Sequence, residues 1–309
     1  MRYTHINRLS RLIVNKEKRQ NFKLATDALE PFMNNPPNVL WLSMSPYLKC
    51  FDQRLLSQLA KNVTVRRWEY RQSVDEPCCL RSALDALHEY VSDRTSIEAD
   101  LEKSFGHPAS KIHLAGHGVS GIIALLYAQQ YPEHVASLTL LSVAAKPAVN
   151  WQAHYYALRQ LLPCSREMVL AQMTRLLLGH QPVRFAKALS QLLAKDLDSN
   201  ITLHSLAHHT QISPGQVSVP VLVCNGAIDA VIGSQDAEDW HDWQPKETSN
   251  SFQRWHCPEG NHFFHFFHAG AVADVMSAHW QSVSTQQDQS PLLRNQMISP
   301  RITQLASAS

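Results

Sequence analysis

Apolar positions change their spacing several times along the middle of this chain. Short runs of β-branched, aromatic and leucine residues predict buried strands. Segments with apolar residues three and four positions apart lie between these runs and predict helices. We expect strands at residues 39–42, 63–70, 111–116, 135–142, 219–225 and 251–256, and helices at 52–61, 80–91, 119–131 and 263–281. This alternation is typical of a mostly parallel sheet with helices on both faces, so we predict an α/β fold.

The alternation stops at Lys146-Pro147, and residues 148–215 show only helical patterns. Helices are predicted at 151–162, 165–178, 183–196 and 203–210, and Pro214-Gly215 ends this region. We interpret residues 148–215 as a helical cap inserted into a core that is made of residues 38–147 and 216–283.

The two ends differ in composition from this core. Residues 1–37 are rich in Arg and Lys and contain few acids, and we expect them to form a solvated basic extension. A basic amphipathic helix with a membrane-surface or targeting role is the alternative, and a natural start at Met33 is a further one. Residues 284–309 are rich in Gln and Ser, which predicts a disordered tail.

Composition excludes several classes of protein. Apolar residues make up 44% of the chain, as in a globular protein, and a net charge of +2 is too weak a field to argue for nucleic acid binding. Six scattered cysteines without a CxxC pair predict reduced thiols rather than a zinc site. The longest apolar run, Ile122–Ala128, is too short to span a bilayer. We therefore expect a soluble, cytoplasmic protein without a transmembrane segment.

The most informative segment is the predicted strand at 111–116, the turn sequence Gly-His-Gly-Val-Ser-Gly at 116–121, and the helix that ends in Tyr-Pro-Glu-His-Val at 131–135. This segment resembles the α/β-hydrolase superfamily, in which a strand enters a sharp Gly-His-Ser-x-Gly-Gly turn with the serine nucleophile at its apex. The resemblance extends from residue 38 to about residue 281. It implies the α/β-hydrolase fold, with a central sheet flanked by helices and an inserted helical cap.

Counting along the helix sets the register of the turn. In the family the proline follows the nucleophile by fourteen residues, and Gly118 lies fourteen residues before Pro132. The nucleophile position is therefore occupied by Gly118, and Ser120 falls where a glycine usually lets the helix pack closely. Ser120 is an alternative nucleophile, but it would require a strand two residues longer and would put Ile122 in a glycine site.

Two further segments resemble the other members of the catalytic triad. The strand and loop at 220–229 resemble those that end in the triad acid, which assigns Asp229. The Gly-Asn-His-Phe sequence at 260–263 resembles the segment of the triad histidine, which assigns His262. An acid holds the imidazole in one tautomer and stabilises its cation, so both parts of a base are expected.

The binding groups follow from the same resemblance. Val119 would supply one backbone donor to an oxyanion, and Met44 or Ser45 the other, because Pro46 has no amide hydrogen. Trp151 and Tyr155 of the cap are expected to line a pocket for a small apolar or ester-like molecule between core and cap.

Other histidines and one cysteine were weighed as functional groups. His262, His265 and His268 recur at three-residue spacing, but phenylalanines separate them and no carboxylate or cysteine motif accompanies them. We therefore expect neither a metal nor a cofactor. His113 and His117 are expected to be hydrogen-bonded scaffold residues, and Cys50 to be a buried thiol rather than a substitute nucleophile.

Three functions remain open. The chain can be a small-molecule-binding pseudoenzyme on a hydrolase scaffold. It can be a hydrolase or lyase that uses only Asp229 and His262 as an acid–base pair. These two rank nearly equally, ahead of an esterase-like serine hydrolase that uses Ser120. The sequence identifies neither the ligand nor protein partners.

Overall fold

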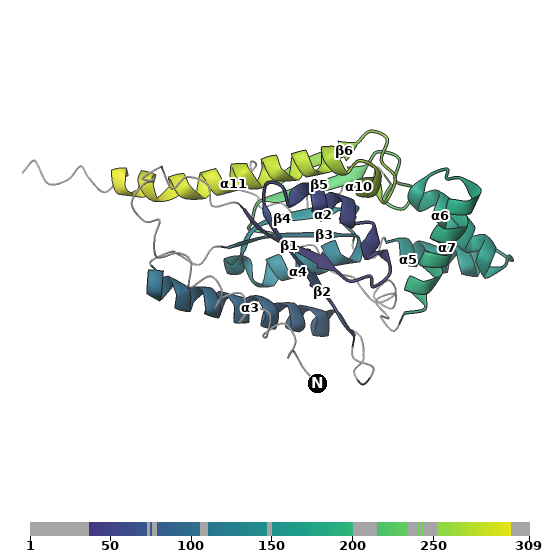
Figure 1. Cartoon of the computed structure of the whole chain (residues 1–309), viewed down its shortest axis with the longest axis horizontal. Coiled ribbons are helices and arrows are strands. Elements are labelled where there is room, and N and C mark those ends of the chain that lie inside the picture. The colour runs from purple at the N-terminus through teal and green to yellow at the C-terminus, as the bar shows by residue number, and fades with distance from the viewer. Residues whose placement is uncertain are drawn as a thin grey trace, which may run out of the picture. The chain divides into compact units, whose positions relative to one another are not determined.

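A six-stranded sheet forms the centre of the molecule in a computed structural model (Figure 1). The structure describes residues 37–72, 75, 79–105, 111–146, 150–199, 215–233, 240, 243 and 252–297. The strands are β1 (Asn38–Ser43), β2 (Thr64–Glu69), β3 (Ile112–His117), β4 (Val135–Leu141), β5 (Val221–Gly226) and β6 (Phe252–Cys257). Their order is β2-β1-β3-β4-β5-β6, and every neighbouring pair is parallel. The predicted α/β class is confirmed, and the carboxyl ends of all six strands lie at one edge.

Helices cover both faces of this sheet. α3 (Leu80–Phe105) and α4 (Val119–Gln130) lie on one face, and α2 (Gln53–Leu59) and α11 (Ala269–Met297) lie on the other (Figure 1). Side chains of β1 alternate between these faces because successive residues of a strand point in opposite directions. Leu40 and Leu42 belong to the core cluster of α3 and α4, whereas Val39 and Trp41 belong to that of α2 and α11.

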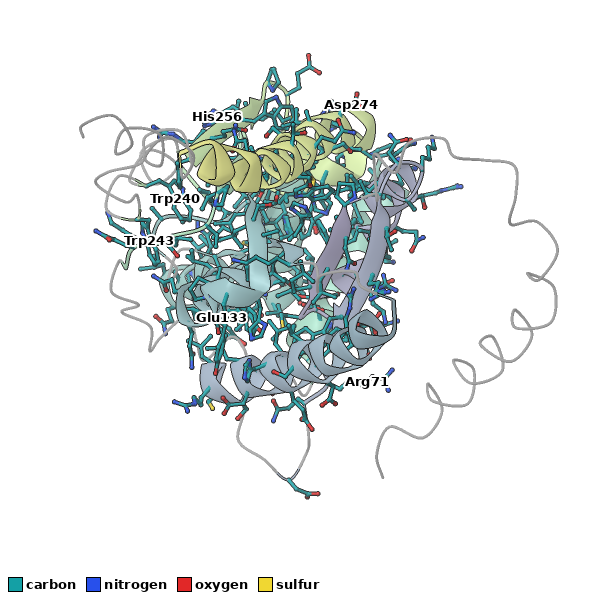
Figure 2. All side chains as sticks on the ribbon, turned by 90° about the vertical axis from the view of Figure 1, so that its left-hand side faces the viewer. Arg71, Glu133, Trp240, Trp243, His256 and Asp274 are labelled. Carbon is teal, nitrogen blue, oxygen red and sulfur yellow. The ribbon has the colours of Figure 1, made fainter. Side chains whose placement is uncertain are left out.

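Two tryptophans belong to the core cluster that α3 and α4 form with the sheet. Trp240 and Trp243, labelled in Figure 2, are almost completely buried and belong to the same cluster as Leu40 and Leu42. The indole Nε1 of Trp243 donates a hydrogen bond to the carbonyl oxygen of Ala145 at 2.9 Å. This bond satisfies a buried donor and holds the chain just after β4.

Within the described residues, three helices are inserted between β4 and β5. They are α5 (Trp151–Leu161), α6 (Arg166–Leu178) and α7 (Val183–Leu197). Side chains of Asn150 and Ser165 accept backbone amides at the starts of α5 and α6, as good capping residues do. The three helices share a core cluster with Leu48, Phe51 and Phe263, which come from segments that follow β1 and β6. The insertion therefore packs over the carboxyl edge of the sheet.

Several bounds differ from the sequence-based expectation. α3 continues to Phe105 rather than ending at Val91, and the helix predicted at 263–281 is split into α10 (Phe264–Phe267) and α11. The disordered tail expected from residue 284 is wrong for residues 284–297, because α11 runs to Met297. Glutamine favours helices, and an anchored helix gains one hydrogen bond per added residue, which explains the longer α11. The extension expected at 1–37, apart from its last residue, the helix expected at 203–210 and residues 298–309 lie outside the described residues.

Two other observations concern the whole described chain. None of its helices combines the length and the apolar composition that crossing a bilayer requires. Cys50, Cys79, Cys164, Cys224 and Cys257 are all free thiols.

Close approach of α4 to the sheet depends on glycine. A Cβ atom on Gly116 would lie 2.7 Å from the backbone carbon of Ser120 and 2.8 Å from the amide nitrogen of Gly121. Backbone atoms in a packed helix cannot move aside cheaply, so no side chain fits there. A Cβ on Gly270, at the exposed start of α11, would meet nothing within 4 Å.

We predict that Gly116→Ala lowers the free energy of unfolding by ~1–3 kcal/mol, the usual cost of overpacking. Gly270→Ala is the matched control and should leave that free energy unchanged or raise it by up to ~1 kcal/mol. Urea unfolding followed by circular dichroism measures both. Equal effects of the two substitutions would show that α4 does not approach β3 as closely as described.

Candidate active site

Asp229 and His262 form a buried hydrogen-bonded pair. Asp229 follows β5, and its Oδ1 accepts the backbone amides of Val231 at 2.9 Å and Ile232 at 3.1 Å. Its Oδ2 lies 2.9 Å from Nδ1 of His262. Burial alone would raise the pKa of Asp229, but His262 and the two amides outweigh it and hold this pKa below its usual value. An ionised Asp229 keeps the proton of His262 on Nδ1 and leaves Nε2 as the basic nitrogen.

The backbone of His262 is held from the other side. Its carbonyl oxygen accepts Ser142 Oγ at 2.6 Å and His117 Nε2 at 3.0 Å. Ser142 has a φ of 47°, a conformation that non-glycine residues rarely adopt, in the turn after β4. His262 is 0% exposed, and its Nε2 has no hydrogen-bond partner within the part of the chain that the structure describes. The imidazole is thus rigidly oriented with one acceptor nitrogen unused.

Gly118 forms the turn between β3 and α4. Its φ of 53° and ψ of −125° lie in a region that residues with a side chain rarely adopt. Its amide donates to Leu141 O at 2.9 Å, and its carbonyl accepts the amide of Ile122 at 3.1 Å. A Cβ added at Gly118 would meet nothing within 4 Å, so the turn, unlike Gly116, has open space beside it.

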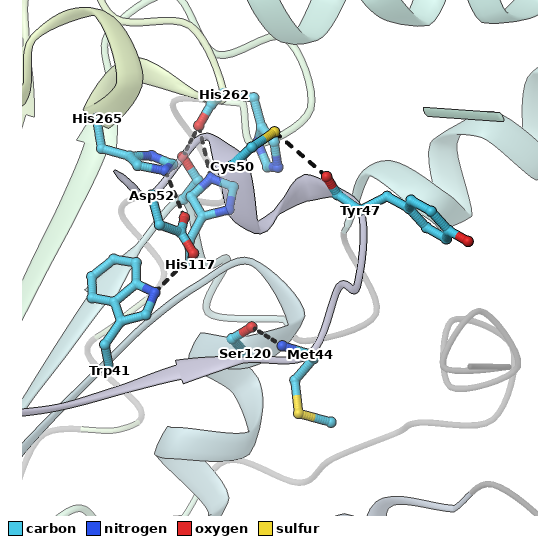
Figure 3. Close-up of polar contacts among 10 residues, drawn as sticks. Trp41, Met44, Tyr47, Cys50, Asp52, His117, Ser120, His262 and His265 are labelled. Atoms are coloured by element: carbon cyan, nitrogen blue, oxygen red, sulfur yellow. Dashed lines mark hydrogen bonds and ion pairs between the residues drawn. The ribbon is translucent and has the colours of Figure 1, made fainter. Parts of the chain in front are cut away.

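Ser120 lies in the first turn of α4 and not on the β3–α4 turn. Its Oγ accepts the backbone amide of Met44 at 3.0 Å, a bond between residues 76 positions apart (Figure 3). In the close-up, Ser120 and Met44 lie together and away from His262 (Figure 3). We expected Ser120 only to pack against the sheet, and it instead binds the loop that follows β1.

A small pocket adjoins this turn. Its volume is about 30 Å³. Its lining is more polar than the apolar site that we expected, with side chains of Ser43, Ser45, Lys49, Asp52, His117 and Gln152 among it. The Oε1 of Gln152 is buried and has no partner among the described residues.

Most of the predicted binding residues meet at this pocket. Ser45, Gly118, Val119, Ser120 and Trp151 all line it. Tyr155 does not, because it is buried within the insertion and packs edge-on against Tyr156 with ring centroids 5.1 Å apart. Asp229 and His262 are also absent from the lining, and His117 and Phe263 stand there instead.

A second buried Asp–His pair was missed by the sequence analysis. His265 Nε2 lies 3.1 Å from Asp52 Oδ1, and Trp41 Nε1 donates to Asp52 Oδ2 at 2.9 Å (Figure 3). Asp52 stands at the N-cap of α2, a position that predicts a helix cap, but its side chain does not cap the helix. The three-residue spacing of His262 and His265 was the available signal, and their partners, Asp229 after β5 and Asp52 before α2, come from segments distant in sequence.

His117 lies between the two pairs. Its ring centroid is 5.0 Å from that of His262 and 4.5 Å from that of His265. Burial and these two imidazoles hold the pKa of His117 well below its usual value, so its ring stays neutral. Its expected scaffold role is confirmed by its bond to His262, and that of His113 by a 2.8 Å bond to Ser137 Oγ. Among the residues with described positions, no group of three or more His, Cys, Asp or Glu side chains could hold a metal ion.

Cys50 is not the buried thiol that we expected. It is exposed, and its Sγ donates a hydrogen bond to the carbonyl oxygen of Tyr47 at 3.5 Å (Figure 3). Partial burial raises the pKa of this thiol, so it is not activated as a thiolate.

Comparison with known proteins identifies relatives of this chain. No protein-family model matches it. It is 38% identical to the uncharacterized protein alr2406 of Nostoc sp. over 81% of this chain and 92% of that protein. It is also 38% identical to the uncharacterized protein sll0249 of Synechocystis sp. over 82% of this chain and 95% of that protein. The chain belongs to the family of these two proteins.

Solved structures establish the fold of this family member. A hydrolase from Pseudomonas aeruginosa is 17% identical with a TM-score of 0.56, over 79% of this chain and 89% of that one. A thermophilic esterase from Thermogutta terrifontis is 16% identical with a TM-score of 0.55, over 81% of this chain and 91% of that one. Both are similar to this chain in fold, which is the α/β-hydrolase fold.

Asp196 of α7 connects the insertion of this α/β-hydrolase fold to the pocket. Its Oδ1 accepts the amide of Tyr47 at 3.2 Å, and the hydroxyl of Ser45 and the amide of Leu48 also bond to its carboxylate. Burial raises the pKa of Asp196 to about 6 despite these bonds. The carboxyl group thus holds the loop that supplies Ser45 to the pocket.

We predict that Asp196 makes the fold less stable as pH rises from 4 to 7. The folded chain keeps a proton on Asp196 that the unfolded chain releases above pH ~4, so raising the pH favours unfolding. Relative to Asp196→Asn, the native chain should lose on the order of 2–3 kcal/mol over this range. Urea unfolding at several pH values measures this. Asp274→Asn, which changes an exposed carboxylate of α11, is the control and should leave the pH profile unchanged.

Proposed function

We propose that this protein converts a small molecule without using a serine nucleophile, and that the Asp229–His262 pair is its base. Gly118 takes the nucleophile position in this proposal. Three observations support that assignment: the fourteen-residue spacing to Pro132, the position on the β3–α4 turn, and backbone angles that only glycine adopts without strain. The observation that carries the proposal is the buried 2.9 Å bond between Asp229 and His262, because it orients an imidazole whose Nε2 has no partner among the described residues and can act as a base.

The chemistry available to this pair is proton transfer. Nε2 of His262 accepts a proton from the bound molecule or from a water molecule, and Asp229 stabilises the imidazolium that forms. The open space beside Gly118 leaves room for the proton-donating group where a serine side chain would otherwise stand. His262 then returns its proton to the product. The three inserted helices act as a cap in this scheme, since their cluster covers the segments after β1 and β6.

Binding without catalysis is the second candidate function. The observation that favours it is the burial of His262, which is 0% exposed and does not line the pocket. Molecules that co-purify with the protein distinguish the two functions. They are extracted, identified by mass spectrometry and incubated in D₂O with native protein or with His262→Ala. If the native protein converts the ligand or exchanges a carbon-bound hydrogen for deuterium, and His262→Ala does not, His262 acts as a base. If the ligand is unchanged with the native protein and with His262→Ala, the protein is a binding protein.

We predict that Gly118→Ser rebuilds part of a serine hydrolase. In the α/β-hydrolase fold the triad histidine takes a proton from the serine on this turn. A hydroxyl at position 118 can therefore give its proton to His262. The native protein should not react with a fluorophosphonate probe, whereas Gly118→Ser should be labelled at residue 118. It should also cleave p-nitrophenyl acetate about tenfold or more above the native rate, and Gly118→Ser/His262→Ala should return to that rate.

The strain of a serine at a φ of 53° costs ~1–3 kcal/mol, so melting curves accompany the activity measurements. Labelling of the native protein at Ser120, located by peptide mapping, would restore the serine-hydrolase alternative. A folded Gly118→Ser variant without labelling or esterase activity would contradict the assignment of Gly118 and the use of His262 as its base.

A further inference from the structure

The hydroxyl group of Ser120 accepts a hydrogen bond within the protein, but no described residue receives the hydrogen bond that it can donate. Ser120 is 7% exposed and lines the pocket, and its Oγ accepts the amide of Met44 at 3.0 Å. No described residue accepts the proton of this hydroxyl. A buried donor without a partner costs ~1–3 kcal/mol, so a ligand oxygen in the pocket is a favourable acceptor for it.

A second donor adjoins the same pocket. Val119 lines the pocket and begins α4, and the first amides of a helix have no acceptor within that helix. The amide of Gly118 is already bonded to Leu141, and that of Ile122 closes the first helical turn on Gly118. Val119 N–H and Ser120 O–H are therefore two donors from consecutive residues beside the β3–α4 turn.

We infer that Ser120 donates its hydroxyl proton to a carbonyl-type oxygen of the ligand and so replaces a backbone donor of the usual oxyanion hole. Met44 strengthens this donor, because a hydroxyl that accepts one hydrogen bond becomes a better donor in the next. The arrangement is a relay from Met44 N–H through Ser120 Oγ–H to the ligand oxygen. Serine side chains are among the groups that stabilise such oxygens as charge develops on them.

This inference rests on the proposed function and specifies its substrate class. The ligand is a carbonyl compound with an acidic proton on the atom next to the carbonyl carbon. When His262 Nε2 takes that proton, the electron pair of the broken bond forms a double bond to the carbonyl carbon. The π pair of the carbonyl moves onto its oxygen, which Ser120 and Val119 stabilise. Reprotonation from His262 reverses the transfer, so no oxidant or other reactant is consumed.

The same bond has an opposite interpretation. If the Ser120 hydroxyl does no more than accept the Met44 amide, it prevents that amide from binding a ligand oxygen. Removing the hydroxyl would then make the amide available as an oxyanion-hole donor. The two interpretations predict changes of opposite sign. Ser120→Ala removes the hydroxyl and should weaken binding and catalysis if the relay is used, but strengthen them if Ser120 is a block.

Binding of acetohydroxamate, which has a carbonyl oxygen next to an acidic N–H, tests the relay in the full-length protein. Isothermal titration calorimetry should show that Ser120→Ala weakens its Kd about tenfold, the loss of one good hydrogen bond. Ser120→Gly exposes the Met44 amide directly and should bind within about threefold of the native protein. Ser190→Ala, which removes a partly buried hydroxyl that bonds within the insertion, is the matched control and should have no effect.

Unchanged or tighter binding by Ser120→Ala would overturn the relay, and so would the absence of binding to the native protein. His262→Ala separates this result from the proposed function. If the proposed function fails and only the relay is correct, His262→Ala should bind acetohydroxamate with the native Kd. Ser120→Ala should still bind it more weakly than the native protein in that case. In the Gly118→Ser background, Ser120→Ala should lower the rate of p-nitrophenyl acetate cleavage to that of the native protein. A higher kcat there would identify Ser120 as a block.

Discussion

The turn between β3 and α4 is the constraint on which the rest of this site depends. Gly116 has no space for a side chain because the backbone at Ser120 and Gly121 lies against it. This contact sets the start of α4 directly on the sheet, which forces a positive φ at Gly118 and turns Ser120 toward the loop after β1. A helix even slightly further from the sheet would separate Ser120 from Met44 and open the pocket.

The second organising factor is the parallel sheet itself. Since all six strands end at one edge, the segments after β1, β3, β5 and β6 meet there and bring together two Asp–His pairs. Each carboxylate is held by further donors, so each imidazole has a defined tautomer and one nitrogen without a partner among the described residues. His117 packs between them, and its lowered pKa keeps its ring neutral.

These features agree better with our proposal of an enzyme whose chemistry has changed than with a protein that has lost catalytic activity. In our proposal the turn lacks only the nucleophile side chain, whereas the Asp229–His262 bond and the hydrogen bond that Ser142 donates to His262 are present. A serine stands two residues further along, where it contacts the pocket and a backbone amide rather than the histidine. In our proposals, the hydroxyl has thus moved from attacking a carbonyl carbon to stabilising a carbonyl oxygen, and the base acts on the ligand itself.

Local sequence patterns determine much of this architecture. Alternating apolar periods specify the order of strands and helices, and the distance from Gly118 to Pro132 specifies which residue occupies the turn, because both are written into contiguous sequence. Asp229 and His262 lie in short contiguous segments that resemble those of the triad acid and histidine, so the sequence was also enough to assign them. Contacts between distant segments were decided by the tertiary structure alone. The Ser120–Met44 bond joins residues 76 positions apart and the Asp52–His265 bond residues 213 positions apart. No local pattern encodes such pairs, since they depend on how closely α4 packs on the sheet and where the loops after parallel strands converge.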